Sequence, residues 1–297
     1  MTRILVTGAQ GQLGQELVTL LTSLGEIRGI DRNELDLTEF DKVEAFWQDL
    51  QPDIVVHGAA YTAVDKAEED VDLAMQVNGE VPGKLARLAA ASGTQLIHIS
   101  TDYVFDGSKN QPYLETDRTN PLSSYGRSKL QGEQVVQESG ATFAILRTAW
   151  VYGNGMTGNF VKTMLRLGQE REELRVVYDQ VGSPTWTVDL AGAIAQLIPK
   201  LNSETVGIYH YTNAGVTSWY DFAIAIFEEA QKLGIPLKIK RVLPITTDQY
   251  PTPAKRPAYS VLSGKKLADL LGTPAPHWRQ SLQKMLAEYA ENLVYRG

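Results

Sequence analysis

The chain of 297 residues contains no cysteine, which excludes disulfide bonds, thiolate metal sites and cysteine nucleophiles. It has no apolar run near the 18 residues of a membrane-spanning helix, and its first residues lack the long apolar segment of a signal peptide. It also has no block rich in lysine or arginine, and its net charge is −7, so we expect no binding to nucleic acid or to a membrane. These absences predict a cytoplasmic protein whose partner is a small molecule.

The residues that are present are those of an ordinary soluble protein, with 43% hydrophobic and 21% charged side chains. The length allows one large domain or two modest ones with a substantial core. The four histidines, His57, His98, His210 and His277, are too scattered for a metal-ligand pattern. We therefore predict no histidine metal site.

The N-terminal segment has the order strand, glycine turn, helix. Residues 4–6 are apolar, Gly8, Gly11 and Gly14 follow, and leucines recur at helical spacing to residue 24. In a dinucleotide-binding loop such glycines allow a tight turn, a close approach to a pyrophosphate, and close packing of helix on strand. The spacing Gly-x-x-Gly-x-x-Gly in this context indicates a dinucleotide site.

Charged and small residues follow the next two predicted strands. Asp31 ends the strand at 27–30 and could accept hydrogen bonds from a ribose 2′-hydroxyl, as in NAD sites, whereas the adjacent Arg32 could meet the 2′-phosphate of NADP. Gly58, Ala59 and Ala60 close the apolar run 53–60, where small side chains let a cofactor pack against the backbone. The choice between the two cofactors stays open at this point.

The segment 96–129 has the strongest catalytic pattern. A strand at 95–100 delivers Ser100 and Thr101 to the carboxyl edge of the sheet, and a later helix opens with Tyr125 and Lys129. These two side chains are four residues apart and share one helix face, so the ammonium could favour ionisation of the phenol. Taken alone, the same spacing also fits a surface tyrosine and lysine on an amphipathic helix.

Five alternations of strand and helix predict an α/β fold, a Rossmann-like doubly wound parallel sheet, with a smaller C-terminal substrate-binding portion. We assign residues 1–153 and about 173–212 to the NAD(P)-binding domain, and about 154–172 and 213–297 to the substrate-binding portion. Within a long helical region at 67–92, Pro82 is expected to break or kink the helix, and Gly93 to end it.

Seven motifs taken together resemble the extended short-chain dehydrogenase/reductase superfamily and, within it, the family of dTDP-4-dehydrorhamnose reductases. The resemblance covers nearly the whole chain. Its motifs are residues 7–14, 59–68, 100–107, 121–129, 146–153, 180–185 and 256–257.

The resemblance implies reduction of the C4 ketone of a dTDP-bound 4-keto-6-deoxy sugar by a reduced nicotinamide. Tyr125 would donate the proton, Lys129 would lower the tyrosine pKa and hold the nicotinamide ribose, and Thr101 would hydrogen-bond the developing alkoxide. The cofactor-binding residues would be Gly8, Gly11, Gln12, Leu13, Gly14, Asp31, Arg32, Asp36, Leu37, Ala59, Ala60, Tyr61, Thr62, Ser100, Tyr125 and Lys129. The substrate-binding residues would be Val64, Thr101, Asp102, Phe105, Tyr125, Trp150 and Arg256.

The same resemblance favours NADPH and leaves NADH open. Some members of the family bind Mg²⁺ through acidic residues at a dimer interface, and Glu16 matches one of these. The sequence Trp-Thr-Val-Asp after Thr185 lacks the next acid. We therefore assign no metal ligand, and a homodimer stays an open possibility.

Two other functions fit the same scaffold. A sugar-nucleotide 4,6-dehydratase or epimerase is one, although dehydratases usually carry Glu where this chain has Tyr103. The other is a non-catalytic NADP-binding protein, because the regulatory subunit of methionine adenosyltransferase resembles this subfamily. Intact Thr101, Tyr125 and Lys129 favour the reductase.

Overall fold

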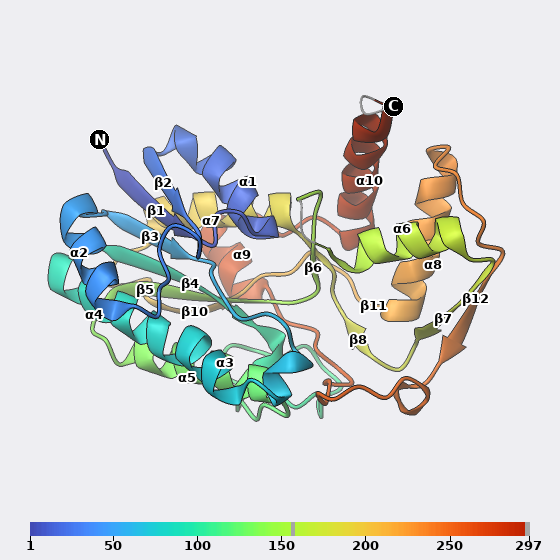
Figure 1. Cartoon of the computed structure of the whole chain (residues 1–297), viewed down its shortest axis with the longest axis horizontal. Coiled ribbons are helices and arrows are strands. Elements are labelled where there is room, and N and C mark those ends of the chain that lie inside the picture. The colour runs from blue at the N-terminus through green and yellow to red at the C-terminus, as the bar shows by residue number, and fades with distance from the viewer. Residues whose placement is uncertain (156–157, 295–297) are drawn as a thin grey trace.

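A parallel sheet of six strands organises the larger part of the molecule (Figure 1). The computed structural model describes residues 1–155 and 158–294. The strand order is β10-β5-β4-β3-β1-β2, and every pair is parallel. The strands are β1 (Arg3–Thr7), β2 (Glu26–Ile30), β3 (Ile54–His57), β4 (Gln95–Thr101), β5 (Thr142–Thr148) and β10 (Gly207–His210). The chain reverses its direction across the sheet at β1, so a ligand crevice is expected at the carboxyl ends beside that strand.

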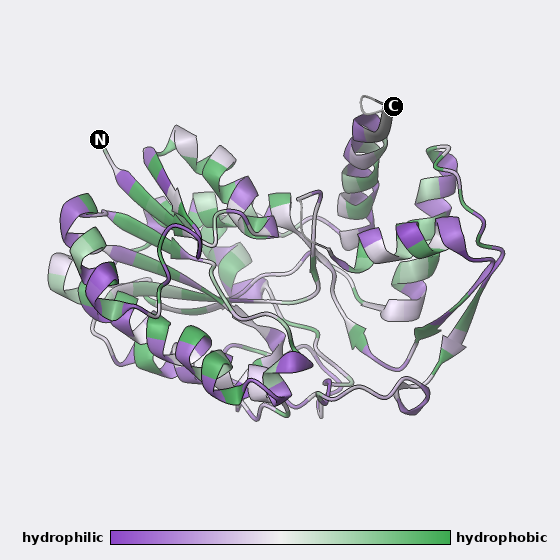
Figure 2. Ribbon diagram, in the orientation of Figure 1, coloured by the Kyte–Doolittle hydropathy of each residue, from purple (hydrophilic) through white to green (hydrophobic). Residues whose placement is uncertain are grey.

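Alternate side chains of each strand enter two separate cores, because successive residues of a strand face opposite sides. Ile4 and Val6 belong to one core, and Leu5 between them belongs to the other. The inner strands β1 and β3 are correspondingly hydrophobic along most of their length, and Figure 2 shows this in the sheet. The first core is covered by α1 (Gln12–Leu20), α7 (Thr187–Leu197) and α9 (Lys265–Leu271), and the second by α2 (Phe40–Leu50), α4 (Val81–Ser92) and α5 (Ser124–Gln137). The predicted α/β doubly wound fold is confirmed.

The helical region before β4 is divided by a π-helical turn. It contains a 3-10 turn (Lys66–Glu68), α3 (Val71–Met75), the π-helix η3 (Gln76–Glu80) and then α4. The division falls at the predicted break, because Pro82 occupies the first turn of the new helix α4, where a backbone N–H is dispensable. Gly93 caps α4 in the left-handed conformation with φ 71°, which confirms the predicted stop.

A smaller portion packs around a third core, at the right of Figure 1. It contains α6 (Phe160–Glu170), α8 (Trp219–Lys232), α10 (Trp278–Val294) and the parallel pair β7 (Glu173–Val177) and β12 (Arg241–Ile245). Because β7 pairs with β12 and not with the large sheet, the boundary assigned near residue 173 lies too early for the strand order. The division into two domains itself stays a prediction.

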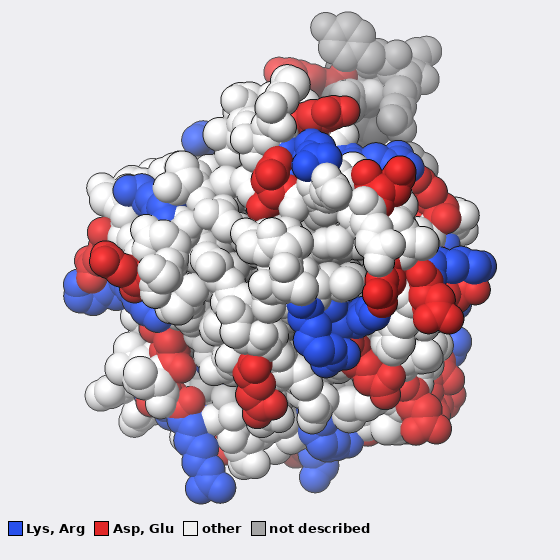
Figure 3. All heavy atoms as spheres, turned by 90° about the vertical axis from the view of Figure 1, so that its left-hand side faces the viewer, with Lys and Arg blue, Asp and Glu red and all other residues white. Residues whose placement is uncertain are grey.

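Short strands and 3-10 turns lie between the longer elements. They are the strands β6 (Val151–Tyr152), β8 (Val181–Gly182), β9 (Thr185–Trp186) and β11 (Thr217–Ser218), and the 3-10 turns η1 (Leu21–Ser23), η4 (Asp102–Val104), η5 (Ile198–Lys200) and η6 (Thr247–Gln249). Among the described residues, no helix is long and apolar enough to cross a membrane. Acidic and basic side chains are interspersed on the face shown in Figure 3.

Candidate active site

A cleft of about 1140 Å³ opens at the carboxyl ends of the strands. Its walls come from the glycine loop, the ends of β2, β3, β4 and β5, and the start of α5. All the residues predicted to bind cofactor or substrate line it, except Phe105 and Arg256. The structure therefore gathers into one site residues that lie as far apart in sequence as Gly8 and Trp150.

The glycine loop is shaped for close approach. Gly8 has φ +70°, and a Cβ there would lie 2.9 Å from the backbone of Ala59. A Cβ at Gly14 would lie 2.0 Å from the carbonyl oxygen of Gly8, so this glycine lets α1 pack on the loop. A Cβ at Gly11 would meet only that same oxygen, at 3.1 Å, and would occupy the cleft. The loop and the N-terminus of α1 thus form a cradle that fits a pyrophosphate.

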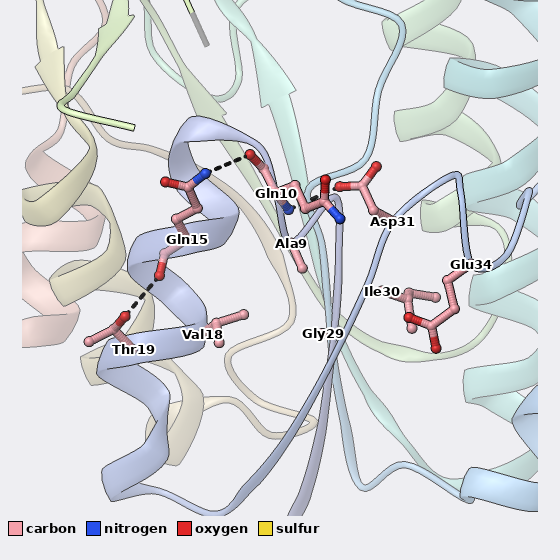
Figure 4. A pocket seen from close by; sticks show the side chains of 9 residues that line it. All are labelled: Ala9, Gln10, Gln15, Val18, Thr19, Gly29, Ile30, Asp31 and Glu34. Atoms are coloured by element: carbon pink, nitrogen blue, oxygen red, sulfur yellow. Dashed lines mark hydrogen bonds between the residues drawn. The ribbon is translucent and has the colours of Figure 1, made fainter. Parts of the chain in front are cut away.

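Asp31 lies where the cleft meets a smaller pocket of about 440 Å³ between α1 and β2 (Figure 4). Its carboxylate accepts hydrogen bonds from the backbone N–H groups of Gln10 (2.9 Å) and Arg32 (2.8 Å). The Arg32 side chain is exposed and pairs with Asp36 at 3.3 Å. Hydrogen bonds from Thr38 and the nearby Arg32 charge hold the pKa of Asp36 below its usual range. The site thus offers both an acidic and a basic side chain near the end of β2.

An asparagine that the sequence analysis did not single out fixes the loop after β3. Asn78, which is 1% exposed, accepts from the Tyr61 N–H (2.8 Å) and donates to the Tyr61 carbonyl (3.0 Å) and to the Ser128 hydroxyl (3.0 Å). It belongs to the π-helical turn, a feature frequent at functional sites. In the sequence, the signal that could have pointed to Asn78 was a polar amide inside a predicted helical region.

Tyr125 and Lys129 lie on the cleft wall at the start of α5, which Ser123 caps by accepting a hydrogen bond from the Gly126 N–H. Burial raises the pKa of Tyr125 to about 12, against a lowering contribution from a hydrogen bond with Thr101. Burial lowers the pKa of Lys129 to about 8, against a raising contribution from Glu133.

The sequence prediction that Lys129 lowers the pKa of Tyr125 does not match this arrangement. The Lys129 ammonium donates to the carbonyl of Ile99 at 2.7 Å, while burial, Thr101 and Asp102 set the pKa of Tyr125. At neutral pH the phenol is therefore protonated and able to donate a proton.

Asp102 and Tyr103 complete the cleft beside Tyr125. Burial raises the pKa of Asp102 to about 6, while hydrogen bonds from Ser260 and Thr101 oppose the shift. Its Oδ2 is buried and has no hydrogen-bond partner among residues 1–155 and 158–294. The ring of Tyr103 meets that of Tyr125 edge to face, with centroids 5.4 Å apart. Asp102 thus lines the cleft with one carboxyl oxygen buried and without a partner in the described part of the chain.

Trp150 forms the wall between the two portions of the molecule. Its ring is parallel to that of Trp219, with centroids 3.5 Å apart. Its backbone has φ 50°, which is unusual for a bulky residue and marks a conformation fixed by its surroundings. Val64 lines the same cleft. Trp150 therefore presents a rigid apolar surface to the ligand.

Two predicted substrate residues lie elsewhere. Phe105 is fully buried and stacks on Tyr113 at 4.1 Å, because the 3-10 turn η4 directs it into a small core behind the cleft. It is a core residue in this structure, and its predicted substrate contact stays a prediction. Arg256 is not among the lining residues and pairs with Asp65 at 2.8 Å. Asp65 follows the cleft residue Val64 in sequence, so Arg256 lies near the cleft opening.

The acidic residues do not form a metal site within the described part of the chain. Burial and the charge of Glu288 raise the pKa of Glu16. Asp189 instead accepts hydrogen bonds from Asn213 (2.7 Å) and Ser281 (2.5 Å). No group of three His, Asp or Glu side chains in residues 1–155 and 158–294 is placed to hold a metal ion.

Comparison with known proteins agrees with this arrangement. The family described as RmlD substrate binding domain matches residues 1–291. A dTDP-4-dehydrorhamnose reductase of Burkholderia thailandensis is 45% identical over 288 residues, which are 94% of this chain and 96% of that protein.

Two crystal structures cover nearly the whole chain. That of a dTDP-4-dehydrorhamnose reductase from Clostridium acetobutylicum has a TM-score of 0.90 and 43% identity, and covers 97% of this chain and 99% of its own. That of the Bacillus anthracis dTDP-4-dehydrorhamnose reductase in complex with NADP has a TM-score of 0.90 and 40% identity, and covers 97% and 100%.

Proposed function

The chain belongs to the RmlD substrate binding domain family, and we propose that it catalyses the NADPH-dependent reduction of dTDP-4-dehydro-6-deoxy-L-mannose to dTDP-L-rhamnose. The observation that carries this proposal is one cleft that joins a dinucleotide-binding glycine loop to Tyr125, Lys129 and Thr101. A reduced nicotinamide supplies the hydride when it is bound. The chain supplies binding, orientation and the proton.

Tyr125 is the proton donor in this mechanism. As negative charge develops on the C4 oxygen, a neutral phenol in contact with that oxygen transfers its proton. A pKa near 12 keeps the phenol protonated across the physiological range. The Thr101 hydroxyl, which donates to Asp102 at 3.1 Å, would turn its one proton to the same oxygen when substrate binds.

Lys129 holds a positive charge beside the reacting group. Its ammonium has three donors, of which the Ile99 carbonyl takes one at 2.7 Å. We assign the others to a ribose, as the family resemblance implies.

The remaining walls set what can enter. Asp102, which lines the cleft, would accept a hydrogen bond from a sugar hydroxyl, and Trp150 would give the sugar ring a rigid apolar surface. Arg256 is held near the cleft opening by Asp65 and suits the diphosphate of a nucleotide sugar. These roles are proposals that follow from each side chain's chemistry and place.

A spectrophotometric assay separates this reaction from its rivals. Purified protein is mixed with NADPH and freshly generated dTDP-4-keto-L-rhamnose, with NADH in a parallel cuvette, and absorbance of the reduced nicotinamide is followed. Stoichiometric loss of absorbance supports the reductase. A dehydratase or epimerase would convert its nucleotide sugar with no net loss of NADPH, and a regulatory subunit would bind NADPH without turnover of any keto sugar.

The compartment and the oligomeric state are further proposals. A chain without cysteine that uses nucleotide-linked substrates suits the cytoplasm, and a homodimer is compatible with the family. Cell fractionation tests the first, and light scattering of the purified protein across a concentration series tests the second. A membrane-fraction location or a monomer at all concentrations would contradict the respective proposal.

A further inference from the structure

A row of polar side chains crosses three neighbouring strands behind the cleft. The sheet register pairs Ser100 of β4 with Arg147 of β5, and Arg147 with His210 of β10. All three residues are at most 4% exposed. Arg147 lies 3.4 Å from the His210 ring and 5.0 Å from the centroid of Phe105. This row has no role in the reaction described above, apart from Ser100, which lines the cleft.

Glu133 of α5 contacts two residues of this row, Ser100 and Arg147. It is fully buried and accepts two hydrogen bonds from the Arg147 guanidinium, at 2.9 and 2.6 Å, and one from the Ser100 hydroxyl at 2.5 Å. Residues 125, 129 and 133 are spaced by four along α5, so their side chains share one face of the helix. Glu133 therefore ties the face that carries Tyr125 and Lys129 to the residue preceding Thr101.

A fully buried ion pair such as Arg147–Glu133 commonly adds little to the stability of the fold. Removing two charges from water costs more than their attraction commonly returns, and apolar residues of similar volume often serve as well. The geometry here is instead specific, with a bidentate pair and a third donor that all meet one carboxylate. Such a cluster fixes both the negative charge and the orientation of the Glu133 carboxylate, which suggests that the site depends on them.

We propose that Glu133, paired with Arg147, is a positioning residue for the reduction: it locks the Lys129 turn of α5 against the Ser100–Thr101 end of β4 and keeps Lys129 in its charged form. This inference rests on the roles proposed above for Tyr125, Lys129 and Thr101. It assigns Glu133 no contact with substrate or cofactor.

The electrostatic part of the proposal involves the charged and titratable groups around Lys129. Glu133 faces it from α5, His57 and His98 from β3 and β4, and Arg147 pairs with Glu133 from β5. Burial holds both histidines neutral by lowering their pKa values, to about 3 for His57. Glu133 is thus the anion that opposes the loss of the lysine charge, with His210 beyond Arg147 also neutral through burial.

The test compares Glu133→Gln, which keeps shape and removes charge, with Glu138→Gln at the exposed C-terminal end of the same helix. Selectively ¹³C-labelled lysine reports the titration of Lys129 by NMR, assigned with Lys129→Met, independently of turnover. The pH profile of kcat is measured in the NADPH assay. Glu133→Asp retains the charge and tests rescue, and Glu133→Gln combined with Arg147→Met removes both buried charges in case the single variant does not fold.

We expect Glu133→Gln to lower the pKa of Lys129 by about one pH unit, to move the alkaline limb of kcat equally, and to reduce kcat about tenfold or more. Glu133→Asp should recover much of this, the double variant should keep the acid-shifted limb, and Glu138→Gln should behave as wild type. A folded Glu133→Gln, or a folded double variant, with the wild-type Lys129 titration and pH profile would overturn the proposal. An inactive wild type would refute the proposed function alone, because the NMR titration measures the effect of Glu133 on the pKa of Lys129 without turnover.

Discussion

Two glycines of the same loop should respond in opposite ways to an added side chain. At Gly11 the backbone has φ −69° and ψ 167°, which any residue adopts, and a Cβ would meet only the Gly8 oxygen at 3.1 Å. The chain can therefore fold with valine there, at a cost of about 1 kcal/mol in the free energy of unfolding for an apolar residue at an N-cap. The valine methyl groups would instead occupy the cleft where the loop meets a pyrophosphate.

At Gly14 the added atom meets the backbone itself. A Cβ would lie 2.0 Å from the Gly8 oxygen and 2.7 Å from the Ala9 Cα. Neither atom can rotate away, so α1 or the loop must shift, and overpacking of this kind costs about 1–3 kcal/mol or more. Gly14→Ala should thus destabilise the protein, whereas Gly11→Val should mainly weaken binding.

Urea unfolding and NADPH titration by fluorescence measure the two effects separately. For Gly11→Val we expect a free energy of unfolding within about 1 kcal/mol of wild type and NADPH binding weakened by at least about tenfold, or 1.4 kcal/mol. Gly14→Ala should show the larger loss of stability. Wild-type NADPH affinity in a folded Gly11→Val protein would refute the placement of the dinucleotide at this loop.

Two further predictions concern buried ionisable groups. Lys129→Met should weaken NADPH binding and lower kcat, and wild-type activity should fall above about pH 8, where the lysine loses its charge; a titration and a pH profile check this, and intact binding and rate would contradict it. Asp102 has a folded pKa of about 6 against 3.8 unfolded, so the folded state binds the extra proton, and stability falls as pH rises from about 4 to 6. Asp102→Asn should therefore gain up to about 3 kcal/mol over wild type at pH 8 and nothing at pH 4. Equal differences in urea unfolding at both pH values would contradict that assignment.

The fold was predictable because its signals are local and periodic. Apolar runs at Arg3–Thr7 and Ile54–His57, together with Gly8 and Gly93 at positions that require positive φ, specify strands, turn and helix end. The predicted helix break at Pro82 is confirmed, because the π-helical turn ends just before it and the proline lies in the first turn of a new helix. The pairing of β7 with β12 depends on contacts between distant segments that periodicity does not encode.

The residues of the candidate site were predictable where they belong to a sequence motif. They were less predictable where packing between distant elements sets the direction of a side chain or its hydrogen bonds. The glycine loop and Tyr125 lie in the cleft as expected. The direction of the Tyr125 pKa differs from the prediction, since helical spacing shows that Lys129 shares a face with Tyr125 but not that its ammonium turns to the Ile99 carbonyl. Asn78 and Glu133 act through hydrogen bonds to other elements, which a sequence alone does not show.

The most direct measurement is a single-turnover reaction of Tyr125→Phe with NADPH and dTDP-4-keto-L-rhamnose, beside wild type, with NADPH affinity measured on the same samples. Phenylalanine keeps the ring that packs against Tyr103 and removes only the proton donor. We predict nearly unchanged NADPH binding and a rate about 10²–10⁴-fold lower. A wild-type rate in Tyr125→Phe would contradict the central claim that this phenol delivers the proton.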